Sequence, residues 1–105
     1  MNEWFDIGAI DEIPRQGARV LASPQGPIAV FRTVEDRVFA VLDRCPHKGG
    51  PLSQGIVHES RVSCPLHNWV IDLEQGAAVQ PDEGCVKRFP VRVERQRIFL
   101  QLAAV

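Results

Sequence analysis

The stretch DRCPHKGGPLSQGIVHESRVSCPLHNW (residues 43–69) is the part of this chain that decides its fold. It carries two pairs of a cysteine and a histidine at short spacing, Cys45 with His47 and Cys64 with His67. Sixteen residues separate His47 from Cys64. Glycine and proline gather around the first pair, which is typical of a loop. The stretch therefore predicts two loops, each of which presents one thiolate and one imidazole.

The four side chains form a donor set for a transition metal. Thiolates and imidazoles together select zinc or an iron–sulfur centre over calcium or magnesium. A tetrahedral zinc site is one interpretation, but zinc fingers of this composition usually place both cysteines in one half and both histidines in the other. Here each loop offers one of each, which favours a two-iron cluster. In such a cluster Cys45 and Cys64 bind one iron, and His47 and His67 bind the other.

The segments outside this stretch have the periodicity of short β-strands. Segments 27–34 and 37–42 are rich in β-branched and aromatic residues. Segment 88–94 alternates polar and apolar residues, and segment 97–102 returns beside it. Two residues connect the members of each pair, which predicts two hairpins. No stretch of a dozen residues carries a helical stripe. The sequence predicts an all-β fold, a small antiparallel sandwich or barrel. Shorter strand candidates are 4–7, 18–22 and 69–72, and segment 57–63 is predicted to form a hairpin between the two loops.

Length and charge restrict the class of protein further. The chain has 105 residues, a length that suits one small domain. Its net charge is −1, which argues against a nucleic-acid partner. It shows neither an export signal nor 18 consecutive apolar residues. We therefore expect a single domain over residues 1–105, in the cytoplasm and without a membrane partner. The metal-binding excursion, at about 43–82, is expected to be inserted in the β core.

The order, type and spacing of the four donors resemble the signature of Rieske proteins. The resemblance implies a Rieske-type [2Fe–2S] cluster held by Cys45, His47, Cys64 and His67. It also implies an antiparallel β sandwich or barrel with a small cluster-binding subdomain made of two loops. Two neutral imidazoles in place of thiolates raise the potential of such clusters to between about −150 and +300 mV.

High-potential Rieske proteins carry an extra cysteine in each loop, and these two cysteines join in a disulfide. The matching positions in this chain are Gly50 and Leu66. The resemblance therefore implies the lower-potential, ferredoxin-like branch of the family.

Three segments also look like the small subunit of assimilatory NAD(P)H-dependent nitrite reductase: 43–55, 64–73 and PDEGCV at 81–86. This resemblance implies an electron-transfer role beside a large subunit that carries FAD, siroheme and an iron–sulfur cluster and reduces nitrite to ammonium. A soluble ferredoxin that supplies a ring-hydroxylating dioxygenase is the alternative. A non-redox module whose metal only stabilises the fold is the third hypothesis. No residue is a convincing nucleophile or general base, so we expect an electron carrier and no catalytic residue in the isolated chain.

Residues near the two loops carry simpler interpretations. Cys85 is expected to be a small, partly buried apolar residue, and His58 a solvated surface histidine. Trp69 is expected to pack under the cluster. The glycines Gly49, Gly50 and Gly55 are expected to adopt positive φ and to let the backbone approach the cofactor closely.

Overall fold

The structure, a computed structural model, describes residues 2–46, 49–65, 69–79 and 84–103. Within these ranges the chain forms strands and two short 3₁₀ helices and no α-helix, so the predicted all-β class is confirmed. No helix in the same ranges is long and apolar enough to cross a membrane. The elements are β1 (Asn2–Ala9), η1 (Ile10–Glu12), β2 (Gly17–Leu21), β3 (Ile28–Arg32), β4 (Val38–Leu42), η2 (Leu52–Gln54), β5 (Ile56–His58), β6 (Arg61–Ser63), β7 (Val70–Asp72), β8 (Ala77–Ala78), β9 (Arg88–Phe89), β10 (Val91–Glu94) and β11 (Arg97–Ala103).

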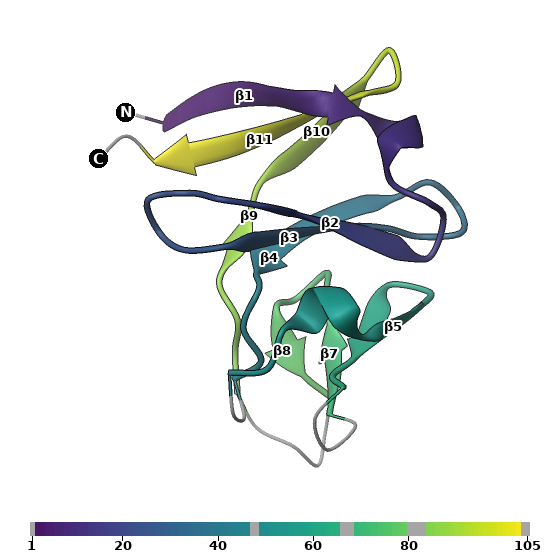
Figure 1. The fold of residues 1–105 in the computed structure, drawn as a ribbon, viewed down its shortest axis with the longest axis vertical. Helices are drawn as coiled ribbons and strands as arrows, with labels where there is room; N and C mark the ends of the chain where they lie inside the picture. Colours follow the sequence, from purple (N-terminus) through teal and green to yellow (C-terminus); the bar gives the residue numbers. More distant parts are fainter. Residues whose placement is uncertain (1, 47–48, 66–68, 80–83, 104–105) are drawn as a thin grey trace.

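The strands form three antiparallel sheets, which Figure 1 shows one above another. The first sheet has the order β1-β11-β10, the second β2-β3-β4-β9 and the third β5-β6-β7-β8. The second sheet lies between the other two (Figure 1). Both predicted hairpins are present, as β3 with β4 and as β10 with β11. Arg95 and Gln96 turn the second hairpin with φ of 50° and 65°, as a two-residue turn between twisted strands requires.

Strand β3 is the centre of the fold because all five of its residues are buried. Successive side chains of a strand point to opposite faces of the sheet. Ala29 and Phe31 therefore pack into a hydrophobic cluster with residues of the third sheet, while Ile28 and Val30 pack into a second cluster with residues of the first sheet. A run of apolar residues without alternation is what a strand buried on both faces needs.

The third sheet lies, along the chain, between two strands that pair with each other. Strand β4 precedes it and β9 follows it, and Ala40 of β4 stands opposite Phe89 of β9. The next residue, Pro90, has no N–H to donate to a sheet, so it separates β9 from β10. The chain passes there from the second sheet to the first. The predicted boundaries of the excursion, 43 and 82, remain a prediction, because residue 82 lies outside the described residues.

A buried arginine ties the start of the chain to the β3–β4 hairpin. The Arg32 guanidinium donates hydrogen bonds to the carbonyl oxygens of Ile10 (3.2 Å) and Ile13 (2.8 Å) and to Asp36 Oδ1 (2.9 Å). Arg15 donates two more hydrogen bonds to the Asp36 carboxylate, at 3.0 and 3.1 Å. Hydrogen bonds from Arg15 and then from Arg32 lower the pKa of Asp36 from 3.8 to about 2.

Replacing Asp36 should change how stability depends on pH. A carboxyl whose pKa is lowered by folding stabilises the protein above its unfolded pKa, and the contribution disappears as pH falls through its folded pKa. We therefore expect Asp36→Asn to have a lower urea midpoint than the parent at pH 7. The gap should narrow from about pH 4 downward and close near pH 2. A gap of constant size over pH 2–7 would contradict the role of the carboxylate. Circular dichroism during urea titration measures both midpoints.

Candidate metal centre

The structure describes two of the four predicted ligands. Cys45 follows β4 and Cys64 follows β6. His47 and His67 lie outside the described residues. In the part of the chain that is described, no three side chains of His, Cys, Asp or Glu come together in a way that would hold a metal ion. The candidate site is therefore built here from the two cysteines and from the loop residues next to them.

Two backbone hydrogen bonds close the first loop on itself. The Cys45 N–H donates to the Gly50 carbonyl at 2.8 Å, and the Gly49 N–H donates to the Cys45 carbonyl at 2.8 Å. Gly49 has φ of 71°, the left-handed conformation that other residues rarely adopt. The turn therefore needs a residue that can adopt positive φ at position 49, and glycine does so without strain. Gly50 and Gly55, however, do not have positive φ, which corrects that part of the expectation.

Gly55 is required by a close approach within the protein. A Cβ on Gly55 would lie 2.1 Å from the carbonyl oxygen of Ser63 and 2.9 Å from Val62 Cγ2. Both of those residues belong to β6, the strand that leads into the second loop. Gly55 thus lets the end of the first loop contact β6, the strand that directly precedes Cys64.

The second loop connects β6 to β7, whose ends Ser63 and Val70 pair with each other. The Cys64 N–H donates to the carbonyl of Trp69 at 2.6 Å, so the loop is closed directly beyond the sheet. The side chain of Trp69 is half-buried and packs against the hydrophobic cluster that contains both cysteines. The second loop is therefore anchored at both of its ends.

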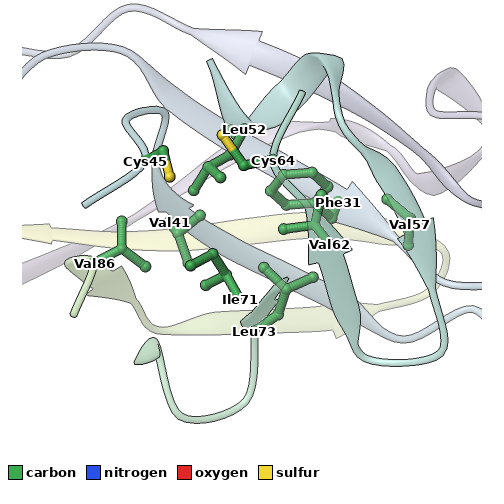
Figure 2. Packing of buried hydrophobic residues seen from close by; sticks show 11 residues of the cluster. Phe31, Val41, Cys45, Leu52, Val57, Val62, Cys64, Ile71, Leu73 and Val86 are labelled. Atoms are coloured by element: carbon green, nitrogen blue, oxygen red, sulfur yellow. The ribbon is translucent and has the colours of Figure 1, made fainter. Parts of the chain in front are cut away.

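The two cysteine side chains share one hydrophobic cluster although they belong to different loops. Cys45 is 2% exposed and Cys64 is 1% exposed. Figure 2 shows them at the margin of the cluster, with Leu52, which is fully buried, nearby. Such a pair can hold a metal ion against the protein core and leave its other side to ligands from the loop tips. The two buried cysteines and the donor set therefore fit a two-iron cluster.

A third segment packs beside the first loop. A Cβ on Gly84 would lie 2.9 Å from Pro46 Cβ and 3.7 Å from the Trp69 ring, so Gly84 sits between residues of both loops. Cys85 follows it, pairs with Ala77 in an isolated bridge and is exposed. The prediction of a partly buried Cys85 was wrong, because this residue lies in an open groove of about 310 Å³. The groove is lined by Arg44, Cys45, Pro46, Gly49, Cys85 and Lys87, among others.

The prediction for His58 was also wrong. The side chain is half-buried and its Nε2 lies 2.9 Å from the Ser63 hydroxyl. Both residues belong to the β5–β6 hairpin. His58 therefore has a structural contact within the third sheet.

Sequence reasoning assigned no role to Asp43 and Ser53, which lie on the two sides of the first loop. The Asp43 carboxylate accepts two hydrogen bonds from Ser53 across it, one from the backbone N–H and one from the hydroxyl, and both are 2.7 Å long. No periodicity or known ligand spacing points to this pair, since neither residue type is a ligand of a Rieske cluster. The pairing of an acid and a hydroxyl ten positions apart appears only in the folded chain.

Comparison with known proteins agrees with this arrangement. Residues 3–90 match the Rieske [2Fe-2S] domain family. The ferredoxin subunit of anthranilate 1,2-dioxygenase from Burkholderia cepacia is 40% identical over 94 residues, which cover 89% of this chain and 86% of that one.

Two solved structures have the same fold over nearly their whole length. The Escherichia coli protein NirD has a TM-score of 0.84 at 26% identity, covering 99% of this chain and 100% of its own. A chain from Mycobacterium tuberculosis assigned as an NADH-dependent nitrite reductase small subunit has a TM-score of 0.87 at 24% identity, covering 100% and 99%. The second likeness shows the fold alone.

The family match covers both loops and both cysteines, and it includes the sixteen-residue spacing between His47 and Cys64. The chain therefore belongs to the Rieske [2Fe-2S] domain family, whose cofactor is a [2Fe–2S] cluster held by two cysteines and two histidines.

Proposed function

We propose that Cys45, His47, Cys64 and His67 hold the [2Fe–2S] cluster and that this chain is a one-electron carrier. The observation that carries the proposal is the burial of Cys45 and Cys64, from two separate loops, in one hydrophobic cluster. The sequence places one histidine just beyond each of these cysteines. Cys45 and Cys64 hold the inner iron against the core, and His47 and His67 hold the outer iron. When bound, the cluster supplies a redox couple that exchanges single electrons.

The loops suit this role because backbone hydrogen bonds close both of them next to their cysteines. Backbone hydrogen bonds to Gly50 and Trp69 hold Cys45 and Cys64 just beyond the ends of β4 and β6. A metal centre that is held rigidly changes little in geometry when its charge changes, so less reorganisation accompanies electron transfer. The chain itself performs no bond-making chemistry in this proposal, and catalysis belongs to the partner.

The midpoint potential should report the two histidine ligands. Replacing His47 or His67 with cysteine restores a negative charge at the cluster, so we expect the potential to fall by on the order of 100 mV. His58→Gln is the control, since His58 lies in the β5–β6 hairpin and contacts Ser63. It should leave the potential unchanged. A redox titration followed by visible absorbance measures all three variants.

Electron paramagnetic resonance (EPR) of the dithionite-reduced protein provides the check on ligation itself. A rhombic signal with an average g value below that of all-cysteine clusters supports it, and Cys45→Ser and Cys64→Ser should abolish the signal. A colourless, zinc-loaded protein would contradict the proposed [2Fe–2S] cluster. A midpoint potential of the parent protein in the range of all-cysteine clusters would contradict ligation by the two histidines.

Sequence identity favours an oxygenase as the redox partner of this chain. The 40% identity with a dioxygenase ferredoxin subunit extends over most of both chains. In this function the chain takes an electron from a flavoprotein reductase and delivers it to an oxygenase in the cytoplasm.

A small subunit of NAD(P)H-dependent nitrite reductase is the second candidate. It is supported by the likeness of segments 43–55, 64–73 and 81–86 and by the likeness to Escherichia coli NirD, which is 26% identical and matches nearly the whole of both chains. In this function the chain accompanies a large subunit that carries FAD, siroheme and an iron–sulfur cluster.

Affinity capture of the tagged chain from its native cell should separate these two functions. We expect an oxygenase and a flavin reductase to co-purify with the tagged chain. The visible spectrum of the captured material should show no siroheme. Recovery of a siroheme protein in stoichiometric amount would instead establish the nitrite reductase function. The Cys45→Ser variant serves as the control for partners that bind only the cluster-loaded chain.

A further inference from the structure

The Asp43 carboxylate joins the two ends of the first loop by accepting hydrogen bonds from the backbone N–H and the hydroxyl of Ser53. Asp43 directly follows β4, and Ser53 lies in η2. The Ser53 N–H donates to Asp43 Oδ1 at 2.7 Å, and the Ser53 hydroxyl donates to Asp43 Oδ2 at 2.7 Å. Both oxygens of one carboxylate are therefore used by one residue. Hydrogen bonds to an ionised acceptor are among the short and strong ones in proteins.

Each member of the pair is fixed to the rest of the fold. The Asp43 N–H donates to the Pro27 carbonyl at 2.8 Å, which attaches Asp43 to the residue before β3. Ser53 follows Leu52, which is fully buried in the cluster that contains Cys45 and Cys64. The Asp43–Ser53 contact therefore connects the base of the loop to the hydrophobic cluster.

The residues enclosed by this contact are 44–52, and they include Cys45 and His47. Inside that ring, the Cys45 N–H donates to the Gly50 carbonyl. If the Asp43–Ser53 contact opened, β4 and η2 would lose the link that the Asp43 carboxylate makes between them, and the Cys45–Gly50 backbone hydrogen bond would remain. The Cys45 side chain would then have more than one position relative to Cys64.

We propose that Asp43 is a positioning residue, which acts through Ser53 to set where Cys45 meets the cluster. The inference rests on the ligand set proposed above. A purely structural alternative exists, because Ser53 is in the first turn of η2 and a carboxylate there stabilises a helix start. The two roles differ in one respect: only positioning changes the electronic environment of the cluster.

Ser53→Ala is the most direct test. It removes the hydroxyl bond but keeps the charge of Asp43 and the bond from the backbone N–H. We expect a broadened EPR signal in the reduced protein and cluster loss to a chelator about tenfold faster than in the parent, as expected for loss of one hydrogen bond to a charged group. Ser53→Thr keeps a hydroxyl and should restore both properties. Asp43→Ala removes both bonds and should have the larger effect.

Asp6→Ala is the matched control. Asp6 also accepts a backbone N–H, from Gly8 at 3.0 Å, and side-chain hydrogen bonds, from Arg97 at 2.8 and 3.1 Å. It lies in β1 of the first sheet. This variant should lower the thermal unfolding midpoint and leave the EPR line shape as in the parent.

The outcomes separate this inference from the ligand proposal. If the parent protein carries no histidine-ligated cluster, the ligand proposal fails. If the parent carries it and both Ser53→Ala and Asp43→Ala keep the parental EPR line shape, the positioning role is overturned. The same conclusion follows if Asp6→Ala broadens the signal as much. Should Asp43→Ala fail to fold, the comparison of Ser53→Ala with Ser53→Thr still decides.

Discussion

The burial of β3 on both faces is the constraint on which the rest of the structure depends. One face of this strand contributes Ala29 and Phe31 to the cluster that reaches the two cysteines, and the other contributes Ile28 and Val30 to the cluster beneath the first sheet. Neither hydrophobic cluster is complete without it. Because β3 pairs with β4, it also fixes the point from which the first loop departs. The position of Cys45 therefore follows from the packing of a strand that carries no ligand.

The site divides its two tasks between different parts of the same loops. The cysteine end of each loop is buried and held by backbone hydrogen bonds, while the sequence puts the histidines further along. Burial protects the thiolates from solvent, and removal of solvent strengthens their attraction to a positively charged metal. Contact with a partner needs the opposite, a metal ligand near the surface. In the proposed site, a cysteine and a histidine in each loop would serve both requirements with one short segment.

Much of this could be predicted from the sequence because it depends on local pattern. The β3–β4 and β10–β11 hairpins are visible as strand periodicity around two-residue turns, and the cysteine and histidine spacing is specific enough to give the family. What depends on contacts between distant segments could not be predicted. Strand β8 has two residues and η2 has three, too few for any period. Cys85 is placed by its bridge to Ala77, a contact between residues eight positions apart. The Asp43–Ser53 contact joins an aspartate and a serine, and neither residue type belongs to the predicted ligand set.

The pairing of β4 with β9 has a consequence for how the chain folds. Ala40 and Phe89 are distant in sequence, so their contact closes a long loop that contains the whole third sheet. The entropy of closing such a loop is smaller when the intervening chain is already compact. The third sheet, whose strands follow one another through short connections, can form from local contacts and so shorten the effective loop. The third sheet would then form before β9 pairs with β4. The chain would pass through Pro90 into the first sheet only after that pairing. On this view the third sheet, from which the loop with Cys64 departs, also acts as the early-folding part that brings the two halves of the β core together.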